Sequence, residues 1–337
     1  MRRRTVITIV VCCLWVLASA LVWKKILTSG SLYKGKSSYT GIFYVDGIVA
    51  NEDDIYVIGE RMLSSVHTLY LWKNEALIAQ EIQEGYGPGG SFVYGPAVYS
   101  NGNVYTADYM DGRVWKNGAV LYSMGKEPEV RIYRIFADGE DIYLAGSQRE
   151  GSNYYATVWK NGRVLYSYSI KNEATVAIIK DGKDLYYNTG TVIQKNNQAL
   201  YSIKDGFVRD IALDGQDIYV AGGATHSRDH RTALWKNGQL IFKDNSSKYI
   251  SLAKDIFICD KKVYLIGSRW LPVKEGSLSN KEDYDTVWRD GEIIHETTRK
   301  YCEYTISDSC DVYSACGGAQ IRVYKNGDLF YSLYAAP

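Results

Sequence analysis

Two short phrases recur along this sequence and decide its fold. The first is clearest in Asp217-Ile218-Tyr219-Val220-Ala221-Gly222, and the second in Ala233-Leu234-Trp235-Lys236-Asn237-Gly238. Related copies of the first phrase begin at Asp54, Asn103, Asp141, Asp184, Lys262 and Asp311. Copies of the second centre on Trp72, Trp115, Trp159, Gln194, Trp288 and Tyr324. The two phrases alternate strictly, so the chain is a tandem array of seven repeats.

Each repeat translates into four short strands. In the fifth repeat, Asp214-Gly215 precedes the first phrase and Asn237-Gly238 ends the second. Asn-Gly and Asp-Gly between apolar runs are strong hairpin signals, because both turn residues take positive φ. We therefore expect an antiparallel meander of strands A (208–213), B (217–222), C (232–236) and D (239–242).

The spacing of the repeats predicts the architecture. Successive Tyr residues of strand B lie between 33 residues (Tyr186 to Tyr219) and 49 residues (Tyr56 to Tyr105) apart. Four antiparallel strands in a unit of this size are typical of a β-propeller blade. We predict an all-β, seven-bladed propeller over residues 40–337, with an open β-solenoid or two sandwiches as the alternative. No end of the array is offset to lend a strand across the closure, although residues 31–36 faintly echo a D strand.

The two phrases resemble the repeats of bacterial exported β-propeller-like proteins. The resemblance covers about residues 40–334 and concerns architecture; it brings no catalytic residues with it. The repeats lack the Trp-Asp signature of WD40 blades and the Ser-x-Asp-x-Gly-x-Thr-Trp box of sialidase-type propellers. The resemblance therefore implies an exported propeller and gives a glycosidase little support.

A hydrophobic segment precedes the repeats. Arg2, Arg3 and Arg4 stand before an apolar run over residues 6–23, which Lys24 and Lys25 close. Eighteen apolar residues are enough to span a membrane as a helix, and the Arg cluster should stay in the cytoplasm. We predict one N-terminal hydrophobic helix in residues 1–25, followed by a linker over residues 26–39.

The same segment also has the order of a signal peptide, with Ala18-Ser19-Ala20 as the cleavage site. Lipidation at Cys12 or Cys13 lacks the small residue that should precede the cysteine. Whether the segment stays as an anchor or is cleaved, we expect the chain from residue 26 onward to lie outside the cytoplasm, in the periplasm or at the cell surface.

Composition narrows the classes of partner. Lys plus Arg number 39 and Asp plus Glu 38, so no charge excess points to nucleic acid. The Trp residues recur in register, which indicates blade packing rather than a stacking platform for bases. His226 and His230 are four apart, but they fall in a B–C loop, where helical spacing has no meaning. We predict no metal site and no cofactor.

The cysteines of the repeats suit an oxidising compartment. Cys302 in strand A and Cys316 in strand B of the last repeat are disulfide candidates, since a turn near Asp308-Ser309 joins their strands. Counting outward from that turn places the two cysteines one residue out of register, so this bridge would need a bulge. Cys259 and Cys310 lie at A–B turns of neighbouring repeats, and we consider their bridge the less favoured one.

Loop length indicates where a ligand binds. From the Tyr of strand B to the turn after strand C, the span varies from 10 residues (Tyr186 to Asn196) to 26 (Tyr264 to Asp290). B–C and D–A loops share one end of the propeller, and variable loops on a uniform scaffold are typical of a binding surface. The aromatic, His and Arg residues expected in or beside these loops are Trp270, Tyr86, Tyr109, Tyr154, His226, Arg228, His230 and Arg269.

Two functions follow as hypotheses. The first is a binding or scaffold module for a protein or glycan ligand, with Trp270 in the longest loop as the leading contact. The alternative is an extracytoplasmic glycan-active enzyme, which would need two carboxylates to converge near the centre of the propeller. The sequence marks no such pair.

Overall fold

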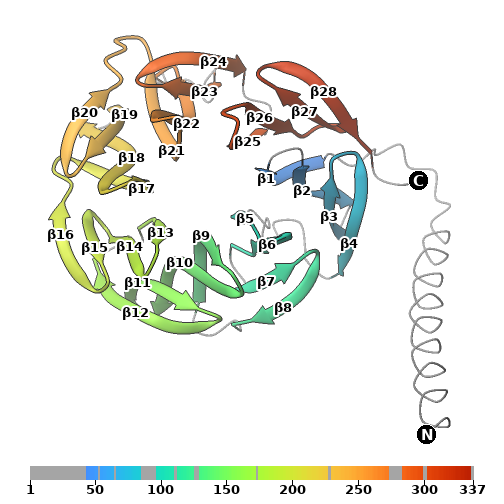
Figure 1. Ribbon diagram of the computed structural model, residues 1–337, viewed down its shortest axis with the longest axis horizontal. Helices are drawn as coiled ribbons and strands as arrows, with labels where there is room; N and C mark the ends of the chain where they lie inside the picture. The colour runs from blue at the N-terminus through green and yellow to red at the C-terminus, as the bar shows by residue number, and fades with distance from the viewer. Residues whose placement is uncertain are drawn as a thin grey trace, which may run out of the picture. The chain divides into compact units, whose positions relative to one another are not determined.

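The protein is a propeller of seven four-stranded antiparallel sheets, as a computed structural model shows (Figure 1). The structure describes residues 43–334 apart from nine short stretches, which are 52–53, 64–65, 85–95, 110–111, 125–128, 172–173, 227–228, 273–282 and 299–301. The described strands all belong to the second of two compact units, Gly41–Pro337. Every sheet contains four strands that are consecutive in sequence, which confirms the predicted blade.

The strands have the following bounds. Blades 1 to 4 consist of β1 (Phe43–Asn51), β2 (Asp54–Leu63), β3 (Val66–Lys73), β4 (Ala76–Glu84); β5 (Ala97–Ser100), β6 (Asn103–Ala107), β7 (Arg113–Lys116), β8 (Ala119–Ser123); β9 (Glu129–Asp138), β10 (Asp141–Glu150), β11 (Asn153–Lys160), β12 (Arg163–Ile170); β13 (Ile178–Asp181), β14 (Asp184–Thr189), β15 (Val192–Lys195) and β16 (Gln198–Ser202). Blades 5 to 7 consist of β17 (Gly206–Asp214), β18 (Asp217–His226), β19 (Asp229–Lys236), β20 (Gln239–Lys243); β21 (Ile250–Cys259), β22 (Lys262–Trp270), β23 (Asp283–Arg289), β24 (Glu292–Thr298); β25 (Cys302–Ile306), β26 (Val312–Cys316), β27 (Ile321–Lys325) and β28 (Asp328–Leu333).

The recurring phrases build one hydrogen-bond network at the end of the propeller that holds the A–B and C–D turns, here called the turn face. In blade 5, Asn237 has a positive φ of 50°, its Oδ1 accepts from the Ile218 amide at 2.9 Å, and its Nδ2 donates to Asp217 at 2.8 Å. Lys236 pairs with the same Asp217 at 2.7 Å and lies over the Tyr219 ring. Blades 1, 3, 4 and 7 repeat the whole set. The phrases therefore recur because they hold hairpins together.

Seven hydrophobic clusters lie between neighbouring blades, one at each interface around the propeller. Four of the repeated tryptophans, Trp72, Trp159, Trp235 and Trp288, belong to these clusters. Trp115 is buried as well, and all five have exposed fractions of 1–3%. Their predicted packing role is confirmed, and truncating such a side chain costs about 3–5 kcal/mol.

Blades 1 and 7 close the propeller without exchanging a strand. Ile321 and Val323 of blade 7 pack in one cluster with Phe43 and Trp72 of blade 1. The backbone of Phe43 also exchanges two hydrogen bonds with Gly318, at 2.8 and 2.9 Å. The end blades are therefore joined by side-chain packing and one backbone bridge. Residues 31–36 lie outside the described part of the chain.

Two disulfides hold the last blade. Cys302 and Cys316 stand directly opposite each other on β25 and β26 with a Cα–Cα distance of 4.0 Å, so the expected one-residue offset was wrong and no bulge is needed. The second bridge, Cys259–Cys310, joins the β21–β22 turn of blade 6 to the β25–β26 turn of blade 7. The pairing that the sequence disfavours is therefore present alongside the favoured one.

The predicted N-terminal helix lies outside the described residues. Within the described residues, no helix has the length and apolarity to cross a membrane.

Candidate functional site

The opposite end of the propeller, here called the loop face, carries the B–C and D–A loops. Tyr109, Tyr154, His230 and Trp270 all lie at this end, on blades 2, 3, 5 and 6. Tyr86 and Arg228 are outside the described residues, as is the side chain of His226. The structure therefore places four of the predicted ligand contacts on one face but spreads them around it.

Three of these side chains make contacts of their own. The ring of Tyr109 packs edge-on against Tyr133 of blade 3 at 5.5 Å, and Tyr154 lies under the guanidinium of Arg149 at 5.7 Å. His230 packs edge-on against a Phe ring at 5.3 Å, and its Nδ1 is buried without a hydrogen-bond partner. Each therefore has a packing role on the loop face.

Two of the predicted contacts need correction. Arg269 is 9% exposed; it pairs with Glu296 at 2.7 Å and with Asp244 at 3.5 Å, and it covers the Tyr249 ring at 4.4 Å. It is a buried tie between blades 5 and 6 rather than an exposed anchor. Trp270 is half-buried because β22 continues to it, and it stands opposite Ile250 and Asp283 in the sheet. The longest loop therefore begins after Trp270 instead of before it.

Charged side chains gather at the centre of the propeller, where the A strands lie. Four charged residues occupy equivalent positions on their A strands, because each pairs with the fifth residue of the first repeated phrase on strand B. They are Arg134, Asp210, Asp255 and Glu303. In blade 1 the equivalent residue is Gly47, which has no side chain. Blades 3, 5, 6 and 7 thus present one cation and three carboxyls toward the middle.

Arg134 bridges the centre of the propeller. Its Nε donates to Asp210 of blade 5 at 3.1 Å, and its Nη2 donates to Asp255 of blade 6 at 2.6 Å. The same Nη2 also reaches the carbonyl of Lys254 at 2.6 Å. Side chains 76 to 121 residues apart therefore meet in one network. Arg134 thus forms two ion pairs that share one guanidinium, and we name Arg134 with Asp210 and Asp255 the axial ion pair.

A second group of carboxyls lies toward blades 1, 2 and 7. It consists of Asp46, Glu60, Asp108 and Glu303, and we name it the acidic pole. Asp46 is 7% exposed, and its pKa is raised well above the usual value by burial and by the charges of the other three. Asp108 pairs with Arg113 at 3.3 Å. Within the acidic pole, Asp46 is thus the carboxyl on which all the charges named act as like charges.

Glu303 connects the two groups. Burial is the largest cause that raises the pKa of this carboxyl, to about 7, and Asp255 and Asp285 raise it further while Lys254 and Arg134 lower it. The side chain is half-buried, so it remains in contact with water. Sequence reasoning missed this site, because the A strands carry none of the repeated phrases.

These raised pKa values predict the pH dependence of stability. Between pH 4.5 and 7 the folded state holds a proton on Glu303 that the unfolded chain releases, so the free energy of unfolding should fall as pH rises. We expect a loss of about 3 kcal/mol at most between pH 5 and 8, with Asp46 acting in the same direction and the lowered pKa of His295 acting against it. The turn-face carboxyls Asp184 and Asp217 have lowered pKa values and titrate below this window.

Urea unfolding of wild type and Glu303→Gln at pH 5, 6, 7 and 8 checks this expectation. The variant should lose most of the slope, since it has no proton to release. A wild-type free energy of unfolding that is constant or rises from pH 5 to 8 would contradict it.

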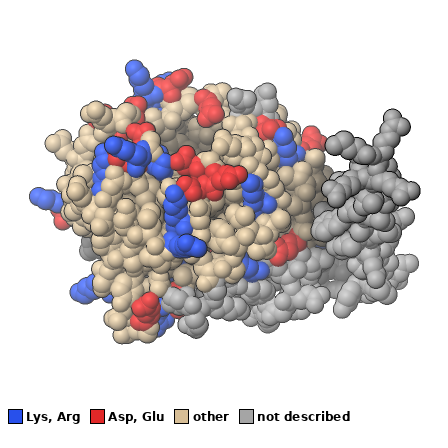
Figure 2. All heavy atoms as spheres, turned by 60° about the horizontal axis from the view of Figure 1, so that its bottom comes forward, with Lys and Arg blue, Asp and Glu red and all other residues tan. Residues whose placement is uncertain are grey.

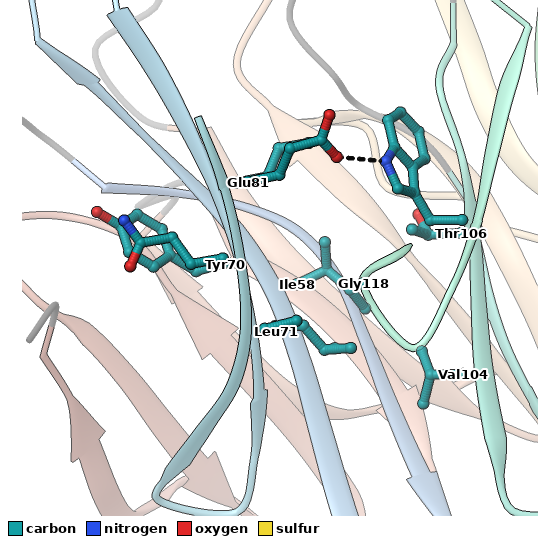
Figure 3. Close-up of a pocket in the computed structure, with 11 residues that line it drawn as sticks. Ile58, Tyr70, Leu71, Glu81, Val104, Thr106 and Gly118 are labelled. Carbon is teal, nitrogen blue, oxygen red and sulfur yellow. Dashed lines mark hydrogen bonds between the residues drawn. The ribbon is translucent and has the colours of Figure 1, made fainter. Parts of the chain in front are cut away.

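An apolar cavity lies between blades 1 and 2 (Figure 3). Strand D of blades 2, 4 and 5 places Tyr122, Tyr201 and Phe242 against the C–D turn glycine of the next blade. Blade 1 has Ala79 at this position, against Gly118, and the missing ring leaves the cavity. Its volume is about 30 Å³, which is room for about two water molecules.

One polar contact closes the rim of this cavity. The Trp115 indole donates to Glu81 at 2.6 Å (Figure 3). A cavity of this size and lining is a packing gap between two blades, and it is too small for a metabolite.

The surface charges agree with a neutral body. Acidic and basic side chains alternate on the face shown in Figure 2, without a large patch of one sign. Among the described residues, no group of three or more His, Cys, Asp and Glu side chains is placed to hold a metal ion.

Comparison with known proteins supports the fold and no more. No family model matches this chain, and no curated protein sequence matches it. Among solved structures, acylaminoacyl peptidase from Pyrococcus horikoshii is similar, with 10% identity and a TM-score of 0.52 over 88% of this chain and 53% of that one. An acylaminoacyl peptidase in complex with Z-Gly-Gly-Phe-chloromethyl ketone gives 11% identity, a TM-score of 0.51 and the same coverages.

The β-propeller domain of the Trilobed protease from Pyrococcus furiosus, which has an open velcro topology, gives 12% identity and a TM-score of 0.48, over 86% of this chain and 95% of that domain. This chain spans about half the length of the acylaminoacyl peptidases it matches. The class defined by fold and comparison is therefore the seven-bladed β-propeller.

Proposed function

We propose that this protein is an exported binding module, anchored by residues 6–23 or released after cleavage, which holds a protein or glycan ligand on its loop face. One observation carries the proposal. The turn face repeats a single structural network in five of seven blades, whereas loop length varies on the loop face, where half-buried aromatic side chains lie. A scaffold that is uniform at one end and variable at the other is what a binding propeller requires.

Two further features support an extracytoplasmic place. Arg2, Arg3 and Arg4 before the apolar run favour translocation of the chain that follows. Two disulfides are typical of proteins that work outside the cytoplasm. We therefore propose the periplasm or the cell surface as the location.

The alternative, a glycan-active enzyme, has less support. Hydrolysis of a glycosidic bond uses one protonated carboxyl and a second one that stays ionised. At the centre of the propeller, the resolved pKa shifts of Asp46, Asp210 and Glu303 are all upward. No resolved shift in this set favours the ionised form that the second role needs.

Trp270→Ala tests the binding module. The side chain is half-buried at the end of a strand, so we expect a small change in melting temperature and loss of retention of a ligand found by glycan array or pull-down. Phe330→Ala removes an exposed aromatic from the outer strand β28 and serves as the control, with binding unchanged. A large fall in melting temperature with unaltered binding would make Trp270 structural and leave the loop face without support.

A further inference from the structure

Asp46 occupies an unusual place in the first blade. The register of β1 against β2 shifts between Val45 and Gly47, so Asp46 is the extra residue of a β-bulge. Bulges turn a side chain out of the regular ladder and are common beside functional sites. The Asp46 side chain is 7% exposed, and neither of its carboxylate oxygens has a hydrogen-bond partner.

Other blades use their own bulges differently. Register shifts also occur in β17 and β21, where the residue after the bulge is Asp210 or Asp255. Both of those carboxyls are bound by Arg134. In blade 1 the carboxyl belongs to the bulge residue itself, Asp46, and the residue after the bulge is Gly47. Gly47 has no side chain that could neutralise Asp46.

The neighbours of Asp46 add negative charge. Glu60, Asp108 and Glu303 each act on it as like charges, and no cation is among the groups that shift it. Of the nearby cations, Arg113 pairs with Asp108 and Arg134 belongs to the axial ion pair, while Lys254 acts on Glu303 and is not among the groups that shift Asp46. A buried carboxylate without a partner costs several kcal/mol, so Asp46 must take up either a proton or an external cation.

We propose that the acidic pole binds the cationic group of a ligand, an ammonium or guanidinium, with Asp46 as its principal contact. This inference rests on the proposed function and names the chemistry of part of its ligand. A metal ion suits the site less well, because no group of described carboxyls is placed to hold one. An ammonium needs only one carboxylate as its principal partner, and Asp46 supplies it. Glu303 of the acidic pole is half-buried, so part of its surface meets solvent.

Two sources share this chemistry, a free polyamine and a lysine side chain of a partner polypeptide. Calorimetric titrations at pH 8 and low ionic strength use spermidine, a capped lysine peptide and the same peptide with its lysine acetylated. We expect saturable binding of spermidine or of the unmodified peptide, weakened by added NaCl. Binding of spermidine alone identifies a polyamine site, and binding of the unmodified but not the acetylated peptide identifies a lysine side chain.

Two variants make the test specific to this site. Asp46→Asn keeps the shape and removes the charge, so affinity should fall at least tenfold while the protein stays as stable as wild type or becomes more stable. Asp214→Asn makes the same change at the exposed end of another A strand, β17, and should bind as wild type does. Absence of saturable binding to wild type, or equal affinity in Asp46→Asn, would overturn the proposal.

The proposed function can survive that failure. If Trp270→Ala abolishes ligand retention while no cation binds at Asp46, the loop face stands as a binding surface and the acidic pole is only a protonated cluster. If cations bind at Asp46 while Trp270→Ala retains its ligand unchanged, the loop-face assignment fails instead.

Discussion

Replacing Arg134 by methionine should lower the free energy of unfolding by about 3 kcal/mol, because the change leaves Asp210 and Asp255 near the centre of the propeller without their shared cation. The three side chains expose 23%, 14% and 26% of their surfaces, so water screens part of the loss and the value stays at the low end for a broken buried pair. Urea unfolding at pH 7 measures it. Arg163→Met, at an exposed position of β12, is the control and should change stability by less than about 0.5 kcal/mol.

A rescue separates lost charge pairing from lost packing. Adding Asp210→Asn and Asp255→Asn to Arg134→Met removes the two unpaired charges, so much of the stability should return. Arg134→Lys should be intermediate, since one ammonium cannot reproduce the fork that reaches a carboxylate on each of two blades and a backbone carbonyl. If Arg134→Met unfolds at the same urea concentration as wild type, the axial ion pair contributes nothing to stability.

The fold was predictable because its signals are local. Asn237-Gly238 forms the turn between strands C and D, and Asp217 at the start of strand B binds Lys236 and Asn237 beside that turn, so the two phrases describe contacts made within one repeat. Such contacts recur with the repeat and can be counted along the chain. The axial ion pair has no local signal, since Arg134 and Asp255 are 121 residues apart and meet only when the propeller closes.

One pattern could have indicated the centre. Arg134, Asp210 and Asp255 each stand directly before an Ile, inside a stretch that is otherwise strand-like. A charge that recurs at one position of a buried strand needs a partner, and the middle of a propeller is where such strands face one another. Asp46 breaks this pattern because the bulge in β1 places the charge one residue earlier.

The errors at the loop face and in the last blade have physical reasons. Arg269 was expected in a loop, but β22 runs on to Trp270 and buries the guanidinium between carboxyls of two blades. The turn in blade 7 is longer than a two-residue hairpin, since Ile306 pairs with Val312, and this restores the register of Cys302 with Cys316. Strand ends and turn lengths depend on packing across blades, which one sequence does not display.

The disulfide between blades 6 and 7 gives the second large expected effect. Cys259 and Cys310 are 51 residues apart, and a cross-link of that span restricts the unfolded chain by about 4 kcal/mol, compared with about 3 kcal/mol for the 14-residue span of Cys302–Cys316. The bridge has a special place because no strand is exchanged where blade 7 meets blade 1. It ties the last blade to its other neighbour.

We therefore expect Cys259→Ser/Cys310→Ser to lose more stability in urea than Cys302→Ser/Cys316→Ser, and the terminal blade to become the first to exchange its amide hydrogens. Wild type treated with reductant should lose at least as much as either double variant. Protein isolated with thiol blocking should yield both bridged peptides in non-reducing maps, as an oxidising compartment requires. Four free thiols in such a map would contradict both the bridges and the proposed export. They would indicate that the protein works in a reducing compartment and that packing alone holds blade 7.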